Sequence, residues 1–187
     1  MSCRLIQNIK HTCEYNPGGI TELFLLPVDD FITYYFRNDS RRETCDIDRV
    51  FIKKDKDYIQ LDVVSQSNFT ESYDNGIYKQ QLTTFVHTLQ HSKTADALIA
   101  EKGKYITFFR TGQGRVYTFG SDGGASFTFT QITGQTGEAS GYNITLSKNS
   151  IYPLFEVDAY KFNKDLVLST ENRIVLPTED MRYAILI

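Results

Sequence analysis

Histidines and cysteines are the residues of this chain best suited to hold a metal ion. His87 and His91 stand four residues apart, a spacing that lets both imidazoles face one metal when the segment is helical. The surrounding "LTTFVHTLQHSK" is rich in Thr and Val, which favours a strand running into a loop instead. His11 lies near two cysteines, but the three cysteines form no C-x2-C unit: Cys3, Cys13 and Cys45. The sequence therefore predicts no metal site and no cofactor.

Carboxylates and nucleophiles are the residues of this chain that could support catalysis. Asp46 and Asp48 in "CDIDR" would lie on one side of a strand, where paired carboxylates can act as acid and base. No further oxygen ligands cluster around them, which favours a charged, solvated surface. No G-x-S-x-G elbow is present, and His11 near Cys13 in sequence does not define a catalytic pair. We expect no catalytic residues, and hence not an enzyme.

A glycine cluster in "YTFGSDGGASFTF" (117–129) could cradle a phosphate or turn a strand. A P-loop needs a Lys after its glycines, because that Lys reaches the phosphates, and none follows Gly120 here. A dinucleotide loop opens a helix, whereas Phe127 and Phe129 alternate with polar residues as in a strand. The cluster is therefore predicted to be a turn.

Composition limits the class of protein. The 187 residues suit one domain with extensions, and 12 Tyr and 13 Phe favour strands. The net charge of −3 and the acids that interrupt each basic stretch argue against a protein that grips nucleic acid. "MSCRLIQNIKHTCEY" lacks the apolar core of a signal peptide, and no apolar run is long enough for a membrane helix. We expect free thiols in a reducing cytoplasm.

The elements that would position these residues are mostly strands. Short strands are expected over 22–26 and 32–36, and "IYKQQLTTFVHTL" reads as a long strand with a polar side. One helix is expected in "KTADALIAEKGK", capped by Thr94, with Ala95, Leu98 and Ile99 on one face. Strands and glycine turns then alternate every 8–12 residues. The predicted fold is mainly β, an antiparallel β-sandwich or barrel with one short α-helix.

The region from about Ile59 to Asp158 resembles the tail-tube-type β-sandwich proteins of tailed bacteriophages, including the crAss-like phages of Bacteroidetes. The resemblance rests on "FTESYDNGIYKQQLTTFV", the helix in "TADALIAEKGKYITFFRT", and "GRVYTFGSDGGASFTFTQITGQTGEASGYNITLS". It implies an N-terminal arm over 1–30, a tail-tube-like sandwich over 31–158, and a C-terminal extension over 159–187. That extension would pack on the sandwich or on a neighbour.

The resemblance also implies a virion structural protein that is assembled in the host cytoplasm. Its subunits would form a closed homo-oligomeric ring in the tail or neck, contact neighbouring tail or neck proteins, and let duplex DNA pass without specific binding or any membrane. The long polar strand supplies the candidate interface or lumen residues, which are Tyr78, Gln80, Gln81, Thr83, Thr84 and His87. The alternative is a β-sandwich module that binds carbohydrate or a host receptor, and a small β-scaffold enzyme is a third hypothesis.

Overall fold

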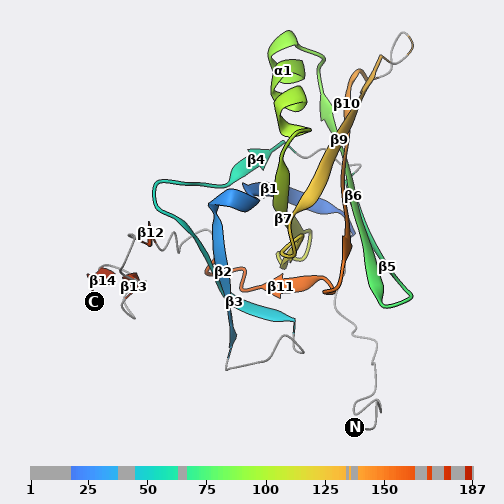
Figure 1. The fold of residues 1–187 in the computed structure, drawn as a ribbon. Helices are drawn as coiled ribbons and strands as arrows, with labels where there is room; N and C mark the ends of the chain where they lie inside the picture. Colours follow the sequence, from blue (N-terminus) through green and yellow to red (C-terminus); the bar gives the residue numbers. More distant parts are fainter. Residues whose placement is uncertain are drawn as a thin grey trace.

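The computed structural model describes residues 18–37, 45–62, 67–133, 135, 139–162, 168–169, 175–177 and 184–186. Strands dominate this part of the chain, and it contains one α-helix, as the sequence predicts (Figure 1). Most strand pairs are antiparallel, and β3 pairs in parallel with β11 and β12. The predicted fold class, a mainly β sandwich or barrel with one short helix, is confirmed.

One half of the hydrogen-bonded sheet rolls around a first core. Its strands, in spatial order, are β4 (Ile59–Leu61), β1 (Ile20–Pro27), β7 (Lys104–Thr111), β8 (Val116–Phe119), β11 (Phe155–Val157), β3 (Asp46–Lys53) and β2 (Phe31–Phe36). A short 3-10 helix, η1 (Val28–Asp30), joins β1 to β2, and β12 (Leu168–Ser169) pairs with β3.

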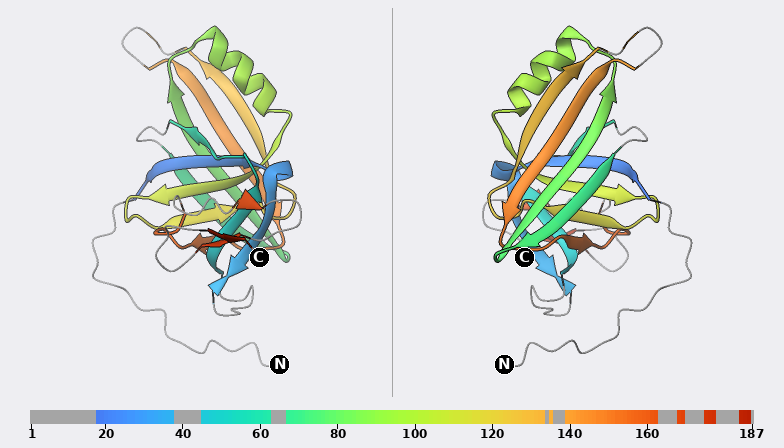
Figure 2. Two further views of the ribbon diagram at one scale, coloured as in Figure 1. Left: turned by 90° about the vertical axis from the view of Figure 1, so that its left-hand side faces the viewer. Right: turned by 90° about the vertical axis from the view of Figure 1, so that its right-hand side faces the viewer.

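The other half is a four-stranded layer that crosses the first. Its order is β9 (Ala125–Ile132), β10 (Gly141–Ser150), β6 (Ile77–His87) and β5 (Asn68–Asp74), and the right view of Figure 2 shows these strands side by side. The helix α1 (His91–Ala100) joins β6 to β7. Two further strands, β13 (Val175–Pro177) and β14 (Ala184–Leu186), pair with each other in a separate sheet.

The glycine cluster forms the corner between the two halves. β8 and β9 pair with the same strand, β7, on either side of the 120–124 loop. Gly120, Gly123 and Gly124 all have positive φ, and the Gly124 N–H donates to the Gly120 carbonyl over 2.7 Å. The predicted turn is therefore confirmed. Strands change sheets at such bends, and these glycines redirect the chain from one core to the other.

Two hydrophobic cores lie on opposite sides of β1 and β7. The first contains Phe24, Leu26 and Phe108 with β3 and β11, and the second contains Leu23 and Phe109 with β6, β9 and β10. Strands covered on both faces need apolar residues at consecutive positions rather than at alternate ones. That requirement explains the unbroken burial of residues 23–26 and 105–109.

The start of the ordered sheet lies within the segment expected to be an arm. β1 falls inside 1–30, yet Leu23 and Leu26 are fully buried, so residues from Ile20 onward belong to the β-sheet. Residues 1–17 lie outside the described residues. In the segment 159–187, Phe162 is buried against Phe24 and Phe108, which anchors its first residues on the sandwich.

The helix exists where the sequence predicts it, but the predicted cap was wrong. It begins at His91 after Gln90, so Thr94 lies inside the helix rather than capping it. The Thr94 hydroxyl donates to the Gln90 carbonyl over 3.1 Å and lies 2.7 Å from the Tyr142 hydroxyl. The buried helix residue is Ala97, while Leu98 and Ile99 are exposed, because α1 packs on the sheet by its small side chains.

Candidate functional site

The outward side of the four-stranded layer is covered by hydroxyl and amide side chains. Burial alternates along these strands, since Gln80, Leu82 and Thr84 of β6 are buried and the residues between them are not. We call the outward set the polar face. Its members are Asn68, Thr70, Ser72 and Asp74 of β5, Lys79, Gln81 and Thr83 of β6, Asn143, Thr145, Ser147 and Asn149 of β10, and Ser126, Thr128 and Thr130 of β9.

Strand register arranges these side chains in rows across the layer. One row runs Asn68, Thr83, Thr145, Thr128, and the next runs Thr70, Gln81, Ser147, Ser126. Residues directly opposite on neighbouring antiparallel strands have Cβ atoms about 5 Å apart. The rows therefore form a continuous surface of short polar groups. At the end nearest α1 two larger apolar side chains, Phe85 and Ile132, join the surface together with His87.

Charge is nearly absent from the polar face. Lys79 and Asp74 are its two charged members, and the Lys79 Nζ lies 2.7 Å from the Asp74 Oδ2. The pair is exposed, so it contributes little to stability, but it leaves the surface electrically neutral. From the neighbouring β7, the Lys104 Nζ donates to the Ser126 hydroxyl over 2.6 Å. Lys104 is in register with Ser126, so it adds one positive charge at the β9 edge of the face. Away from that edge, the face offers hydrogen bonds without a strong attraction for phosphate.

The six predicted residues divide between the two sides of the sheet. Gln81, Thr83 and His87 lie on the outward side. Tyr78, Gln80 and Thr84 face inward, and Gln80 and Thr84 are only 2% and 1% exposed. The division follows from the two-residue period of a strand, which sends neighbouring side chains to opposite faces. Within one copy of the chain, Gln80 and Thr84 are therefore not available to line a lumen.

The inward polar residues hold the β5–β6 hairpin to the body. The Gln80 Nε2 donates to the Glu71 Oε2 over 2.7 Å, and the same oxygen accepts from the Leu154 N–H over 2.8 Å. Deeper in the layer, the Thr84 hydroxyl lies 2.6 Å from the Ser67 hydroxyl in a buried hydrogen bond. These contacts fix the hairpin to the 150–154 segment, so the polar face is held on a defined framework.

The hairpin ends in a tight turn that the sequence signalled. Asn75 and Gly76 have φ values of 50° and 84°, as a two-residue hairpin turn requires. Tyr73 and Tyr78 stack across the strands with ring centroids 4.9 Å apart, and Tyr73 is 66% exposed. β5 pairs with β6 along one edge and ends the strand order of this half of the sheet. Among the described strands, none pairs with the other edge of β5, so within this part of the chain the hairpin carries an open outer edge.

The carboxylates weighed for catalysis are held in ion pairs. The Arg37 Nε lies 3.8 Å from the Asp46 Oδ2 and 3.7 Å from the Asp48 Oδ1, and Asp158 also pairs with Arg37. Partial burial works to raise the pKa of Asp48, but the hydrogen bond and charge of Lys161 and the nearby arginines together lower it. Asp48 stays ionised in this network and is poorly suited to deliver a proton.

The other sequence candidates do not converge. His87 ends β6 and His91 opens α1, so they share no helical face. Partial burial, and next the charge of Glu71, raise the pKa of the Cys45 thiol, which disfavours the reactive thiolate. His11, Cys3 and Cys13 lie outside the described residues. Across the described ranges no group of three His, Cys, Asp or Glu side chains is arranged to hold a metal ion.

Sequence reasoning missed most of the polar face. The signal was present in "GYNITLSKNS", where Asn143, Thr145 and Ser147 alternate with three buried apolar residues. This alternation indicates a strand, but it does not place the polar side on the same surface as Thr83. That assignment requires the antiparallel register of β10 with β6, which pairs Thr145 with Thr83.

Comparison with known proteins finds no matching family model, no matching curated protein and no matching solved structure. Within the part of the chain that the structure describes, no helix has the length and apolar character needed to cross a membrane.

Proposed function

We propose that this chain is a virion structural protein of a tailed bacteriophage, a tail-tube-like subunit that forms a closed ring in the tail or neck. The ring would provide a conduit for DNA during ejection. The observation that carries the proposal is the neutral polar face, which lies on a hairpin with an open strand edge. The resemblance of residues 59–158 to tail-tube subunits supports the same conclusion from the sequence.

The open edge of β5 supplies a means of assembly. Unpaired N–H and C=O groups along a strand favour pairing with another chain, and proteins usually blunt such edges. β5 has seven residues and contains neither Pro nor Lys, while its two acids, Glu71 and Asp74, are each bound to a neighbour within the chain. Pairing of this edge with a different edge of the next copy is a head-to-tail contact, which closes into a ring when the rotation allows.

The polar face is suited to line the resulting pore. Affinity of proteins for DNA comes largely from Lys and Arg that neutralise phosphates, so a conduit must avoid presenting them. Lys79, the one Lys among the members of the polar face, is paired with Asp74, and Lys104 stands at the β9 edge of the face. Hydroxyl and amide groups keep the wall wetted, so that a duplex could slide without being held. In this proposal no residue performs chemistry, and the neighbouring partners are other tail or neck proteins.

Negative-stain electron microscopy with light scattering at high protein concentration tests the proposal. Closed rings with a pore wide enough for duplex DNA are expected. A chain that remains monomeric and binds glycans on an array would instead favour the carbohydrate or receptor-binding alternative.

A matched pair of proline variants tests the role of the β5 edge. Neighbouring strand residues direct their N–H groups to opposite edges. Ser72→Pro and Tyr73→Pro therefore remove N–H groups from different edges of β5. The variant that loses the N–H facing β6 disrupts that ladder, and it should have the lower melting temperature. The other removes an N–H from the open edge, and we expect that variant to lose ring assembly while its melting temperature changes little. Rings that persist in both variants would exclude β5 from the interface.

A further inference from the structure

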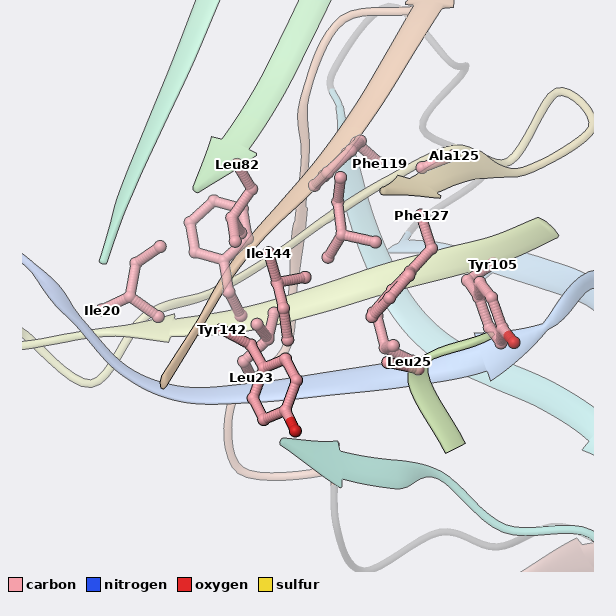
Figure 3. Packing of buried hydrophobic residues seen from close by; sticks show 13 residues of the cluster. Ile20, Leu23, Leu25, Leu82, Tyr105, Phe119, Ala125, Phe127, Tyr142 and Ile144 are labelled. Carbon is pink, nitrogen blue, oxygen red and sulfur yellow. The ribbon is translucent and has the colours of Figure 1, made fainter. Parts of the chain in front are cut away.

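An apolar groove lies between α1 and the edge of the first sheet half. Its volume is about 390 Å³, and its floor is formed by the second core, including Leu25, Phe127 and Tyr105. Figure 3 shows these three side chains next to one another between β1 and β9. One wall is α1 and the other is β4, which the left view of Figure 2 shows below the helix.

The rim of the groove exposes apolar side chains. Ile99 of α1 is 70% exposed, and Ile59 of β4 is 48% exposed. Isolated exposed apolar residues are ordinary, but a cluster that borders an apolar cavity marks an interaction site. Within the described part of the chain both side chains stay open to solvent, so the groove can receive an apolar group from another molecule.

The tip of the β5–β6 hairpin is an apolar projection. β10 pairs with β6 as far as Tyr78, opposite Ser150, so residues 74–77 extend past the last paired residue of β10. Tyr73 is 66% exposed and Ile77 is 42% exposed. The Tyr73 ring is held by its stacking on Tyr78, so little side-chain freedom is lost when another surface covers it. An exposed tyrosine that is fixed in this way is a typical anchor for an apolar pocket.

The tip and the groove lie at opposite ends of the four-stranded layer. In Figure 1, α1 is at the top and the β5–β6 turn is near the bottom, and both views of Figure 2 agree. β6 has eleven residues, which at about 3.3 Å per residue separate its two ends by roughly 35 Å. The tip therefore cannot enter the groove of its own copy, but it can enter that of another. Because such a contact joins two different surfaces, it can repeat from copy to copy.

The charges of the two surfaces are compatible. The groove is lined by one Lys and two Asp, which are Lys93, Asp62 and Asp96. The tip carries Asp74 and Lys79, which pair with each other over 2.7 Å and are both about half exposed. The tip therefore adds no net charge to the groove. In a docked pair, Asp74 can approach Lys93 while Lys79 approaches the rim carboxylates, so opposite charges meet.

We propose that the hairpin tip (73–78) of one copy docks in the α1–β4 groove of a second copy, with Tyr73 against Ile99 and Ile59. This inference rests on the proposed function, since the second copy belongs to the next ring of the assembly. Pairing at the β5 edge adds copies across the strands of the layer, whereas this contact adds copies along them. Together the two contacts build a stack of rings and lengthen the channel.

Photo-crosslinking in the full-length chain tests this docking. A benzoylphenylalanine at position 73 is placed in ¹⁴N protein and mixed with unmodified ¹⁵N protein at concentrations where the chain associates. Mass spectrometry should find crosslinks from position 73 to residues 59–62 or 93–100 carrying the ¹⁵N label. A benzoylphenylalanine at position 160 is the matched control, because Tyr160 is 65% exposed and lies outside both the tip and the groove. It should not label those residues.

Substitutions test the apolar and the charged parts of the contact. Tyr73→Ser should weaken association along the strands by about tenfold or more, and Tyr160→Ser should leave it unchanged. Asp74→Lys should also weaken it, and adding Lys93→Asp to the same chain should restore it, because the two charges then meet with their signs exchanged. Light scattering over a range of concentrations compares the variants. Failure of Lys93→Asp to restore association would contradict the position of the tip.

The outcomes separate the docking from the ring. Closed single rings whose position 73 crosslinks elsewhere overturn the docking and leave the ring intact. Crosslinks from position 73 to the groove of another copy, in chains of copies that close no ring, uphold the docking and contradict the ring. Crosslinks within one copy, or none between copies at the highest concentration, overturn the docking.

Discussion

The strand β7 and the hairpin β5–β6 use their two faces in opposite ways. Residues 105–109 of β7 are all buried, because one core lies on each side of the strand. In the hairpin, Phe69 and Leu82 face a core while Thr70 and Gln81 face outward. The difference indicates that the monomer is held together around β1 and β7. The hairpin, by contrast, leaves one face exposed, and no described strand pairs with its outer edge.

The largest effect is expected from the strand with two buried faces. Phe108 is fully buried and its ring packs against Tyr58 and Phe162. Phe108→Ala should lower the free energy of unfolding by about 3–5 kcal/mol, measured by urea denaturation. The matched change in the hairpin, Gln81→Ala, removes an exposed side chain and should stay within about 0.5 kcal/mol. Equal losses in the two variants would contradict the distinction between these regions.

The corner that separates the two regions should be the next most sensitive position. A Cβ on Gly124 would lie 2.5 Å from the Val28 Cγ2 and 2.7 Å from the Lys104 Cβ, at a φ of +80°. Gly124→Ala should therefore cost about 3 kcal/mol through overpacking and backbone strain. A Cβ on Gly114, at a φ of +82°, would have no neighbouring atom within 4 Å. Gly114→Ala should therefore lower the free energy of unfolding by about 1 kcal/mol, through backbone strain alone. Equal melting temperatures for the two variants would show that the corner is loosely packed.

A smaller effect is expected from the ion pairs beside the first core. The folded pKa of Asp48 is below its usual value, so its contribution to stability is present at neutral pH and is lost as the pH falls through the folded pKa. Asp48→Asn should cost about 1–2 kcal/mol at pH 7, because Lys161 loses a 2.8 Å partner. The difference from wild type should shrink in acid. Asp29→Asn, on an exposed residue, is the control, and a gap that stays constant with pH would contradict the assignment.

The smallest effect on stability is expected at the polar face, where the consequence should appear in DNA binding. Thr83→Lys should change the free energy of unfolding by about 0.5 kcal/mol or less. In assembled rings it would place a circle of lysines in the pore and produce salt-dependent retention of duplex DNA. Thr33→Lys, on the exposed side of β2, is the matched control. Fluorescence anisotropy at two salt concentrations compares them, and equal retention would argue against a lumen position for Thr83.

The sequence was sufficient to predict what local patterns determine. Turn residues predict the Asn75–Gly76 turn and the glycine corner, and the helical spacing of apolar residues predicts α1. The structure has each of them. The outward face of α1 could not be predicted, because which helical face packs depends on the size of the facing surface. The sheet accepts Ala97 and leaves Ile99 exposed.

The polar face could be predicted only in part, for a related reason. The alternation of β6 separates Thr83 from Thr84, yet which set points inward depends on where the second core lies. Residues of β10 join the face through a register between segments that are distant in sequence. Similarly, the continuous buried runs of β1 and β7, the second of which includes Thr107, can be explained only when both cores are in place.

The central claim is that the neutral polar face lines the channel of a ring. Electron cryo-microscopy of the assembled wild-type protein tests it most directly, because the position of each strand relative to the pore can be seen. We predict closed rings in which the row Asn68, Thr83, Thr145 and Thr128 faces the pore. Rings that turn this row toward the outside, or that bury it between subunits, would contradict the account.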